Sequence, residues 1–128
     1  RFSNKSHMAR AVLESVAFQT YELLESMEKD LDTDFESLKV DGGMVANNLL
    51  MQFQSDILDK SIHSQKINEI TALGVGVASY LYVMDLPLSS MGNYITSSKT
   101  WNPNMSNETR INSLESWYKA VEKAKNRL

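Results

Sequence analysis

Apolar residues recur every three or four positions near the start of the chain, which predicts an amphipathic helix over residues 4–30. Ser3 and Asn4 stand just before it and are residue types that cap helix N-termini. Such a stripe is typical of a helix that packs one side against a core. The expected apolar face comprises Leu13, Val16, Ala17, Thr20, Leu24 and Met27.

Two short segments, at residues 37–40 and 61–65, have the character of β-strands, and a helical pattern over residues 44–58 lies between them. A strand–helix–strand unit of this kind predicts two parallel strands joined by a right-handed crossover. The apolar side of the intervening helix is expected to carry Leu49, Leu50, Phe53 and Ile57.

The second half of the chain predicts two more helices. Residues 68–84, opened by Asn68 and Glu69, are apolar on almost every side, so we expect a buried helix that ends before Pro87. Residues 88–105 are rich in Ser, Asn, Thr and Gly without a period, which indicates a loop. A last helix is expected from Ser106, with an apolar stripe of Ile111, Leu114, Trp117, Val121 and Ala124.

Composition narrows the class of protein. Of the 128 residues, 42% are hydrophobic and 23% charged, as in ordinary globular domains, and the order of elements indicates an α/β fold. A net charge of −3 gives no electrostatic reason to expect nucleic-acid binding. There is no cysteine, and His7 and His63 are in no metal-ligand pattern, so we expect no metal site in this chain.

The longest apolar stretch, residues 70–84, is too short to span a bilayer, and no signal peptide is evident. We therefore expect a cytoplasmic protein without a membrane span. Because the chain begins at Arg1 rather than at Met, we expect it to be a segment of a longer polypeptide. Two strands are too few for an independent sheet, so apolar surface is expected to be exposed and a homodimer is a possible state.

The segment with the clearest chemical character is Asp41-Gly42-Gly43, between the end of the first strand and the start of the next helix. Ligands of open parallel sheets bind at this end of the strands, and glycine lets a ligand approach the backbone. Asn47 carries both a donor and an acceptor, which suits the edge of a nucleobase. A tight turn followed by an Asn helix cap explains the same residues, and both interpretations remain open at this point.

The run VDGGMVANNLLMQFQSDIL, residues 40–58, resembles the adenosine-binding motif of the FGGY carbohydrate kinase family. Residues 7–15, 69–74, 101–103 and 117–121 are similar to other segments of that family, so the resemblance covers nearly the whole chain. Asp41 and the Met-Gln-Phe-Gln stretch at 51–54 are similar to the branch that phosphorylates glycerol. Residues 75–80 depart from the smaller residues that the family prefers there.

This resemblance implies a partial ribonuclease H-like (actin-like ATPase) three-layer domain, helix-rich with a short parallel sheet. Residues 1–128 would be the C-terminal part of the family's C-terminal domain, and Gly42, Gly43, Met44 and Asn47 would contact the adenosine of ATP or ADP. The family's phosphate-binding loops, catalytic aspartate and glycerol-holding residues precede this segment. We therefore expect no catalytic residue here, Mg²⁺ held mainly by other parts, and an isolated chain without activity.

Two alternatives accompany this expectation. The chain could come from another sugar kinase of the family, which would share the glycine turn and differ in substrate. It could also be a binding or interaction module derived from such a kinase, with no chemistry of its own. Nucleotide affinity and oligomeric state would distinguish these cases.

Overall fold

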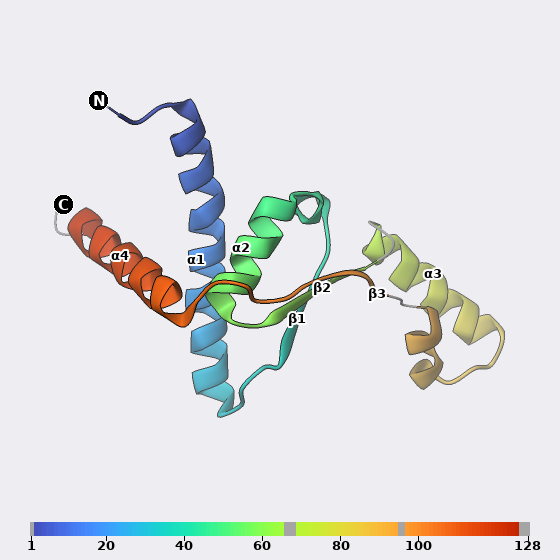
Figure 1. Cartoon of the computed structure of the whole chain (residues 1–128). Helices are drawn as coiled ribbons and strands as arrows, with labels where there is room; N and C mark the ends of the chain where they lie inside the picture. Colours follow the sequence, from blue (N-terminus) through green and yellow to red (C-terminus); the bar gives the residue numbers. More distant parts are fainter. Residues whose placement is uncertain (1, 66–68, 95–96, 126–128) are drawn as a thin grey trace.

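The computed structural model describes residues 2–65, 69–94 and 97–125, which form a small sheet, helices that pack near it, and two helical segments that extend from its end (Figure 1). The elements in chain order are α1 (Lys5–Leu31), β1 (Ser37–Val40), the 3₁₀ helix η1 (Gly43–Ala46), α2 (Asn48–Leu58), β2 (Ser61–Gln65), α3 (Ile70–Val83), the 3₁₀ helix η2 (Leu88–Tyr94), β3 (Ser97–Trp101) and α4 (Asn107–Lys125). The α/β class expected from the sequence is confirmed.

The sheet has the strand order β1-β2-β3. Strands β1 and β2 are parallel, which confirms the predicted strand–helix–strand unit, whereas β3 runs antiparallel to β2. The sheet is therefore mixed, and the expectation of a loop over residues 88–105 was wrong for residues 88–94, which form η2, and for residues 97–101, which form β3. The Ser-Ser-Lys-Thr segment of β3 is polar and lacks the apolar alternation of a strand, so its pairing with β2 determines its conformation.

The core lies between the sheet and helices α1 and α2, with α4 packed beside them. Leu38, Ile62 and Trp101 are neighbours across the three strands and belong to this core. The ring of Phe18 on α1 stacks on Trp117 of α4, with centroids 5.0 Å apart. The apolar core residues that are exposed by 4% or less are Ala17, Leu50, Met51, Ile57, Leu58 and Ile62.

Helix α1 begins where the sequence predicted. The Asn4 side chain accepts hydrogen bonds from the N–H groups of Ser6 and His7, and the His7 ring accepts one from the Asn4 N–H. These contacts satisfy donors that the first turn cannot pair internally. The predicted apolar face was only partly right, because Val16 and Met27 are exposed.

Helix α3 is the clearest departure from the expected packing. It was expected to be buried on all sides, yet Val77 and Leu81 are its only buried residues among those described. Tyr82 and Val83 are 88% and 77% exposed. Figure 1 shows the reason: α3 and η2 extend from the end of the sheet, away from α1 and α4. Asn68, expected to open this helix, lies outside the described residues.

No helix in the described part of the chain combines the length and the apolar character needed to cross a membrane.

Candidate functional site

The glycine turn lies at the carboxyl end of β1, where the chain passes into η1. Gly42 has φ +88°, a conformation that side-chain-bearing residues rarely adopt. A Cβ added at Gly42 or Gly43 would meet no atom within 4 Å, so the backbone is open to its surroundings at both positions. The Val45 N–H donates to the Gly42 carbonyl at 3.2 Å and closes the turn. Met44, half exposed, lies beside the glycines.

Asn47 connects this turn to α2. Its side-chain oxygen accepts the N–H of Leu50 at 3.2 Å, and its carbonyl accepts the N–H of Met51 at 3.0 Å. The predicted helix ran from residue 44 to 58 without a break, whereas α2 starts only after this cap. The capping role is therefore real. It uses only the amide oxygen, and the Asn47 NH₂ group has no hydrogen-bond partner among the described residues.

The four residues expected to form the binding motif, Gly42, Gly43, Met44 and Asn47, thus fall within one short turn. A hollow of about 240 Å³ adjoins it, lined by Lys39, Val40, Asp41, Gln65 and Ile70. The ends of β1 and β2 and the start of α3 meet at this hollow. An open backbone, an available amide donor and a neighbouring hollow together suit a planar, polar ligand.

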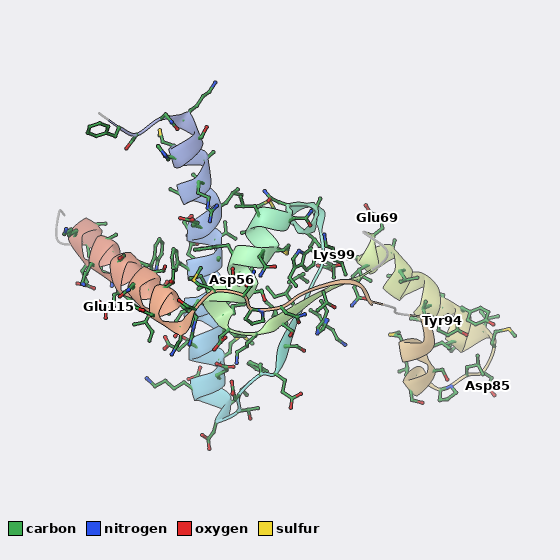
Figure 2. All side chains as sticks on the ribbon, in the orientation of Figure 1. Asp56, Glu69, Asp85, Tyr94, Lys99 and Glu115 are labelled. Atoms are coloured by element: carbon green, nitrogen blue, oxygen red, sulfur yellow. The ribbon has the colours of Figure 1, made fainter. Side chains whose placement is uncertain are left out.

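Sequence analysis gave no role to Lys99 on β3, which reaches the same end of α2 (Figure 2). Its ammonium donates to the Asn48 side-chain oxygen at 2.5 Å and lies 5.0 Å from the centre of the Trp101 ring. Fifty-one positions separate Lys99 from Asn48 in the chain. No local pattern links them, because antiparallel pairing of β3 with β2 brings them together.

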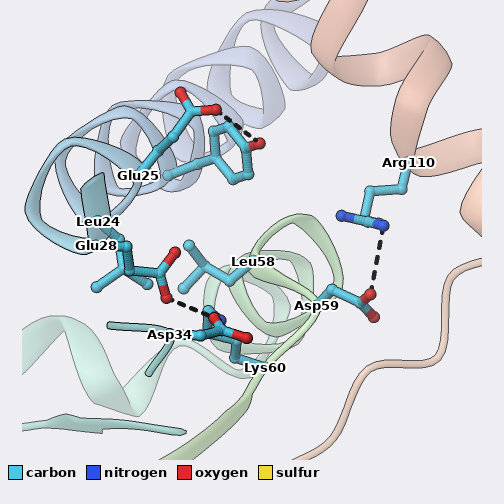
Figure 3. Close-up of a pocket in the computed structure, with 9 residues that line it drawn as sticks. Leu24, Glu25, Glu28, Asp34, Leu58, Asp59, Lys60 and Arg110 are labelled. Carbon is cyan, nitrogen blue, oxygen red and sulfur yellow. Dashed lines mark hydrogen bonds and ion pairs between the residues drawn. The ribbon is translucent and has the colours of Figure 1, made fainter. Parts of the chain in front are cut away.

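A second pocket, of about 330 Å³, lies near the other end of the strands, between α1, α4 and the turn that leads into β2 (Figure 3). Lys60 forms ion pairs with Glu28 at 2.9 Å and with Asp34 at 2.6 Å. Arg110 pairs with Asp59 at 3.3 Å. Both cations of this pocket are therefore already paired with carboxylates of the chain, and we interpret it as a structural ion network.

The pKa directions agree with this interpretation. Burial acts to lower the pKa of Lys60, but hydrogen bonds and charges from Asp34 and Glu28 outweigh it and raise the pKa above its ordinary 10.5. The hydrogen bond from Lys60 lowers the pKa of Asp34 below 3.8. Burial, followed by the negative charge of Glu25, raises the pKa of the Tyr21 hydroxyl. The charged forms of Lys60 and Asp34 thus stabilise each other.

The family profile and the individual sequences that match this chain indicate the same protein family. The profile of the FGGY family of carbohydrate kinases, C-terminal domain, matches residues 1–80. A glycerol kinase of Nocardia farcinica is 47% identical over 98% of this chain, and one of Corynebacterium kroppenstedtii is 43% identical over 98%. The chain spans only 26% and 25% of the lengths of these two relatives.

Solved structures agree with the sequence comparison. The glycerol kinase of Plasmodium falciparum with ADP has a TM-score of 0.84 and 34% identity over 95% of this chain, which covers 25% of that protein. A xylulose kinase of Lactobacillus acidophilus has a TM-score of 0.73 and 21% identity, and the match covers 98% of this chain and 25% of that protein. At this identity the likeness is evidence for the fold and not for the substrate. The chain therefore belongs to the FGGY family of carbohydrate kinases and matches its C-terminal domain.

Proposed function

We propose that this chain forms the adenosine-binding wall of a glycerol kinase. The parent enzyme would transfer the γ-phosphoryl group of ATP to a glycerol hydroxyl and release glycerol 3-phosphate and ADP. The observation that carries the proposal is the open Gly42–Gly43 backbone, followed by an Asn47 NH₂ group that has no hydrogen-bond partner among the described residues. The similarity to glycerol kinases over nearly the whole chain supports this substrate.

Each residue of the turn has a separate part in this proposal. Gly42 and Gly43 allow the ribose and base to lie against the main chain, where any larger side chain would intrude. Asn47 donates its NH₂ group to an acceptor on the adenosine while its oxygen keeps capping α2. Met44 supplies a flexible apolar surface beside the base.

The remaining chemistry belongs to the rest of the parent enzyme. Phosphoryl transfer depends on positioning and on neutralising charge around the phosphates, a role that Mg²⁺ fulfils when bound. We propose that residues 1–128 are the C-terminal part of the family's C-terminal domain, and that the groups holding Mg²⁺, glycerol and the phosphates lie elsewhere. The chain alone would be inactive, and the parent enzyme would use cytoplasmic ATP.

A different sugar kinase of the same family is the first alternative, and a binding module without activity is the second. The structural likeness to xylulose and gluconate kinases, at 21% identity, supports the fold and not their substrates. The higher identity to glycerol kinases favours glycerol.

An NMR titration of the 128-residue chain with ADP tests the binding role. We expect amide shifts confined to residues 42–50, with similar dissociation constants for ADP and ATP because the phosphate contacts are missing. Gly43→Val should abolish the shifts by filling the ligand's space. Gly92→Val is the matched control, since Gly92 is equally open but lies in η2.

Asn47→Asp separates the two roles of Asn47. Aspartate caps helices as well as asparagine does but has no NH₂ group to donate. We expect weaker ADP binding with an unchanged α2. Absence of shifts in the unmodified chain at millimolar ADP would contradict the proposal.

The apolar surface that α1 and α3 expose has a consequence for the isolated chain. Met8, Val12 and Leu23 on α1 are each more than 60% exposed, as are Tyr82 and Val83 on α3. Exposed patches of this kind promote association. We propose that the isolated chain forms homodimers, which would make its sedimentation depend on concentration. A monomer over the whole accessible concentration range would disprove this.

A further inference from the structure

One side of α2 is hydrogen-bonded along its length to β3 and the residues that follow it. Gln52 is four residues from Asn48 and from Asp56 and three from Ser55, spacings that place these side chains on one side of the helix. The contacts are Asn48 Oδ1 with Lys99 Nζ at 2.5 Å, Gln52 Nε2 with the Asn102 carbonyl at 2.8 Å, Ser55 Oγ with the Trp101 carbonyl at 3.1 Å, and Asp56 Oδ1 with the N–H groups of Asn104 and Met105 at 2.7 and 3.2 Å.

Three of these four contacts use the main chain of residues 101–105, but the contact at the N-terminus of α2 depends on one side chain, Lys99. A cation at a helix N-terminus is opposed by the helix dipole. Lys99 is held there by the Asn48 oxygen and by the face of the Trp101 ring, 5.0 Å away. Trp101 is almost fully buried, so packing in the core holds in place the ring over which the Lys99 ammonium lies.

Asn48 directly follows Asn47, whose NH₂ group is the proposed adenosine contact. A restraint on Asn48 therefore limits the motion of the first turn of α2 and of its cap. We infer that Lys99 is a positioning residue for the adenosine turn, acting through Asn48 and not by touching the nucleotide. This inference rests on the proposed function. The family profile ends at residue 80, so β3 and Lys99 lie outside the segment that it matches.

Binding of adenosine and of ADP to three variants tests this role. Lys99→Met keeps an unbranched apolar stem but removes the donor, and Lys99→Arg restores a cationic donor. Lys119→Met is the control, because Lys119 pairs with Glu115 on the exposed side of α4. We expect Lys99→Met to weaken adenosine and ADP equally, by about two- to fivefold, the range typical of an exposed charged contact. Lys99→Arg should recover the affinity and Lys119→Met should not change it.

Hydrogen exchange supplies a readout without nucleotide. The Leu50 N–H donates to the Asn47 side chain and reports the first turn of α2. It should exchange about two- to fivefold faster in Lys99→Met, with the midpoint of thermal unfolding unchanged within a few degrees.

Several results would overturn the inference. Unchanged adenosine affinity in Lys99→Met, while the unmodified chain binds, would remove the positioning role and leave the proposed function intact. A loss for ADP alone would show that Lys99 acts on the phosphates instead. If the unmodified chain bound no nucleotide, the proposed function and this inference would fail together.

Discussion

The body of the chain (α1, α2, α4 and the sheet) and the arm (α3 and η2) use apolar residues in opposite ways. The body buries Leu50, Ile57 and Ile62 almost completely between its layers. In α3 most residues are apolar, yet half of its large apolar side chains are exposed and only Val77 and Leu81 are buried among those described. The T-shaped contact of Tyr80 with Tyr94, at 5.9 Å, ties α3 to η2 and not to the body.

This difference shows that apolar character alone does not determine burial. A helix is buried only where a second surface is present to cover it, and amphipathic helices of the body have such partners in the sheet and in each other. The arm extends beyond the sheet, where α3 packs mainly against the short η2, and among its described residues only Val77 and Leu81 are buried. We therefore expect the stability of the isolated chain to reside almost entirely in the body.

Truncation of a core side chain is the strongest test of this comparison. Ile57→Ala should lower the free energy of unfolding by about 2–5 kcal/mol, because Ile57 is fully buried and its loss leaves a cavity. Val83→Ala in the arm is the matched change and should stay within about 0.5 kcal/mol of the unmodified chain. Urea denaturation measures both values. A comparable loss in the two variants would mean that the arm is packed as tightly as the body.

Removal of one buried hydroxyl should have a smaller effect. Ser55 is fully buried, and its hydroxyl lies 2.8 Å from the Lys60 carbonyl and 3.1 Å from the Trp101 carbonyl. Ser55→Ala should cost about 1–3 kcal/mol, since a buried carbonyl loses its donor. Ser79→Ala is the control in the arm, where the residue is exposed and its hydroxyl donates to the Val75 carbonyl of its own helix. If urea denaturation did not distinguish the two variants, the stabilising role of the buried Ser55 hydroxyl would be contradicted.

The smallest expected effect is the loss, at acidic pH, of the stability that the Asp34–Lys60 ion pair contributes. The hydrogen bond from Lys60 lowers the pKa of Asp34 below 3.8 in the folded chain, so the unfolded chain binds this proton more readily. The stabilisation is therefore fully present above pH 3.8 and is lost as the pH falls through the lower, folded value. Thermal unfolding across this range should show a shallower acid slope in Asp34→Asn. Asp85→Asn is the control, because Asp85 has no ion pair among the described residues.

Local sequence signals were sufficient for part of the fold. The Asn4 cap, strands β1 and β2 and their parallel pairing follow from residue types and spacing over short distances. The glycine turn was recognisable for the same reason, since Gly42 supplies a backbone conformation that other residues rarely adopt. The binding residues expected within that turn remain a prediction of the sequence.

The elements that the sequence patterns predicted wrongly or did not predict depend on contacts with residues far away in the chain. Strand β3 has no alternation of apolar and polar residues, so its sequence predicted a loop. Its extended conformation depends on hydrogen bonding to β2. The exposure of Tyr82 depends on which elements pack against α3. The spacing of apolar residues within a helix does not contain that information. Lys99 meets Asn48 because the sheet folds β3 back beside α2. Sequence thus determined conformations fixed by neighbouring residues, and only the tertiary structure decided the contacts between residues far apart in the chain.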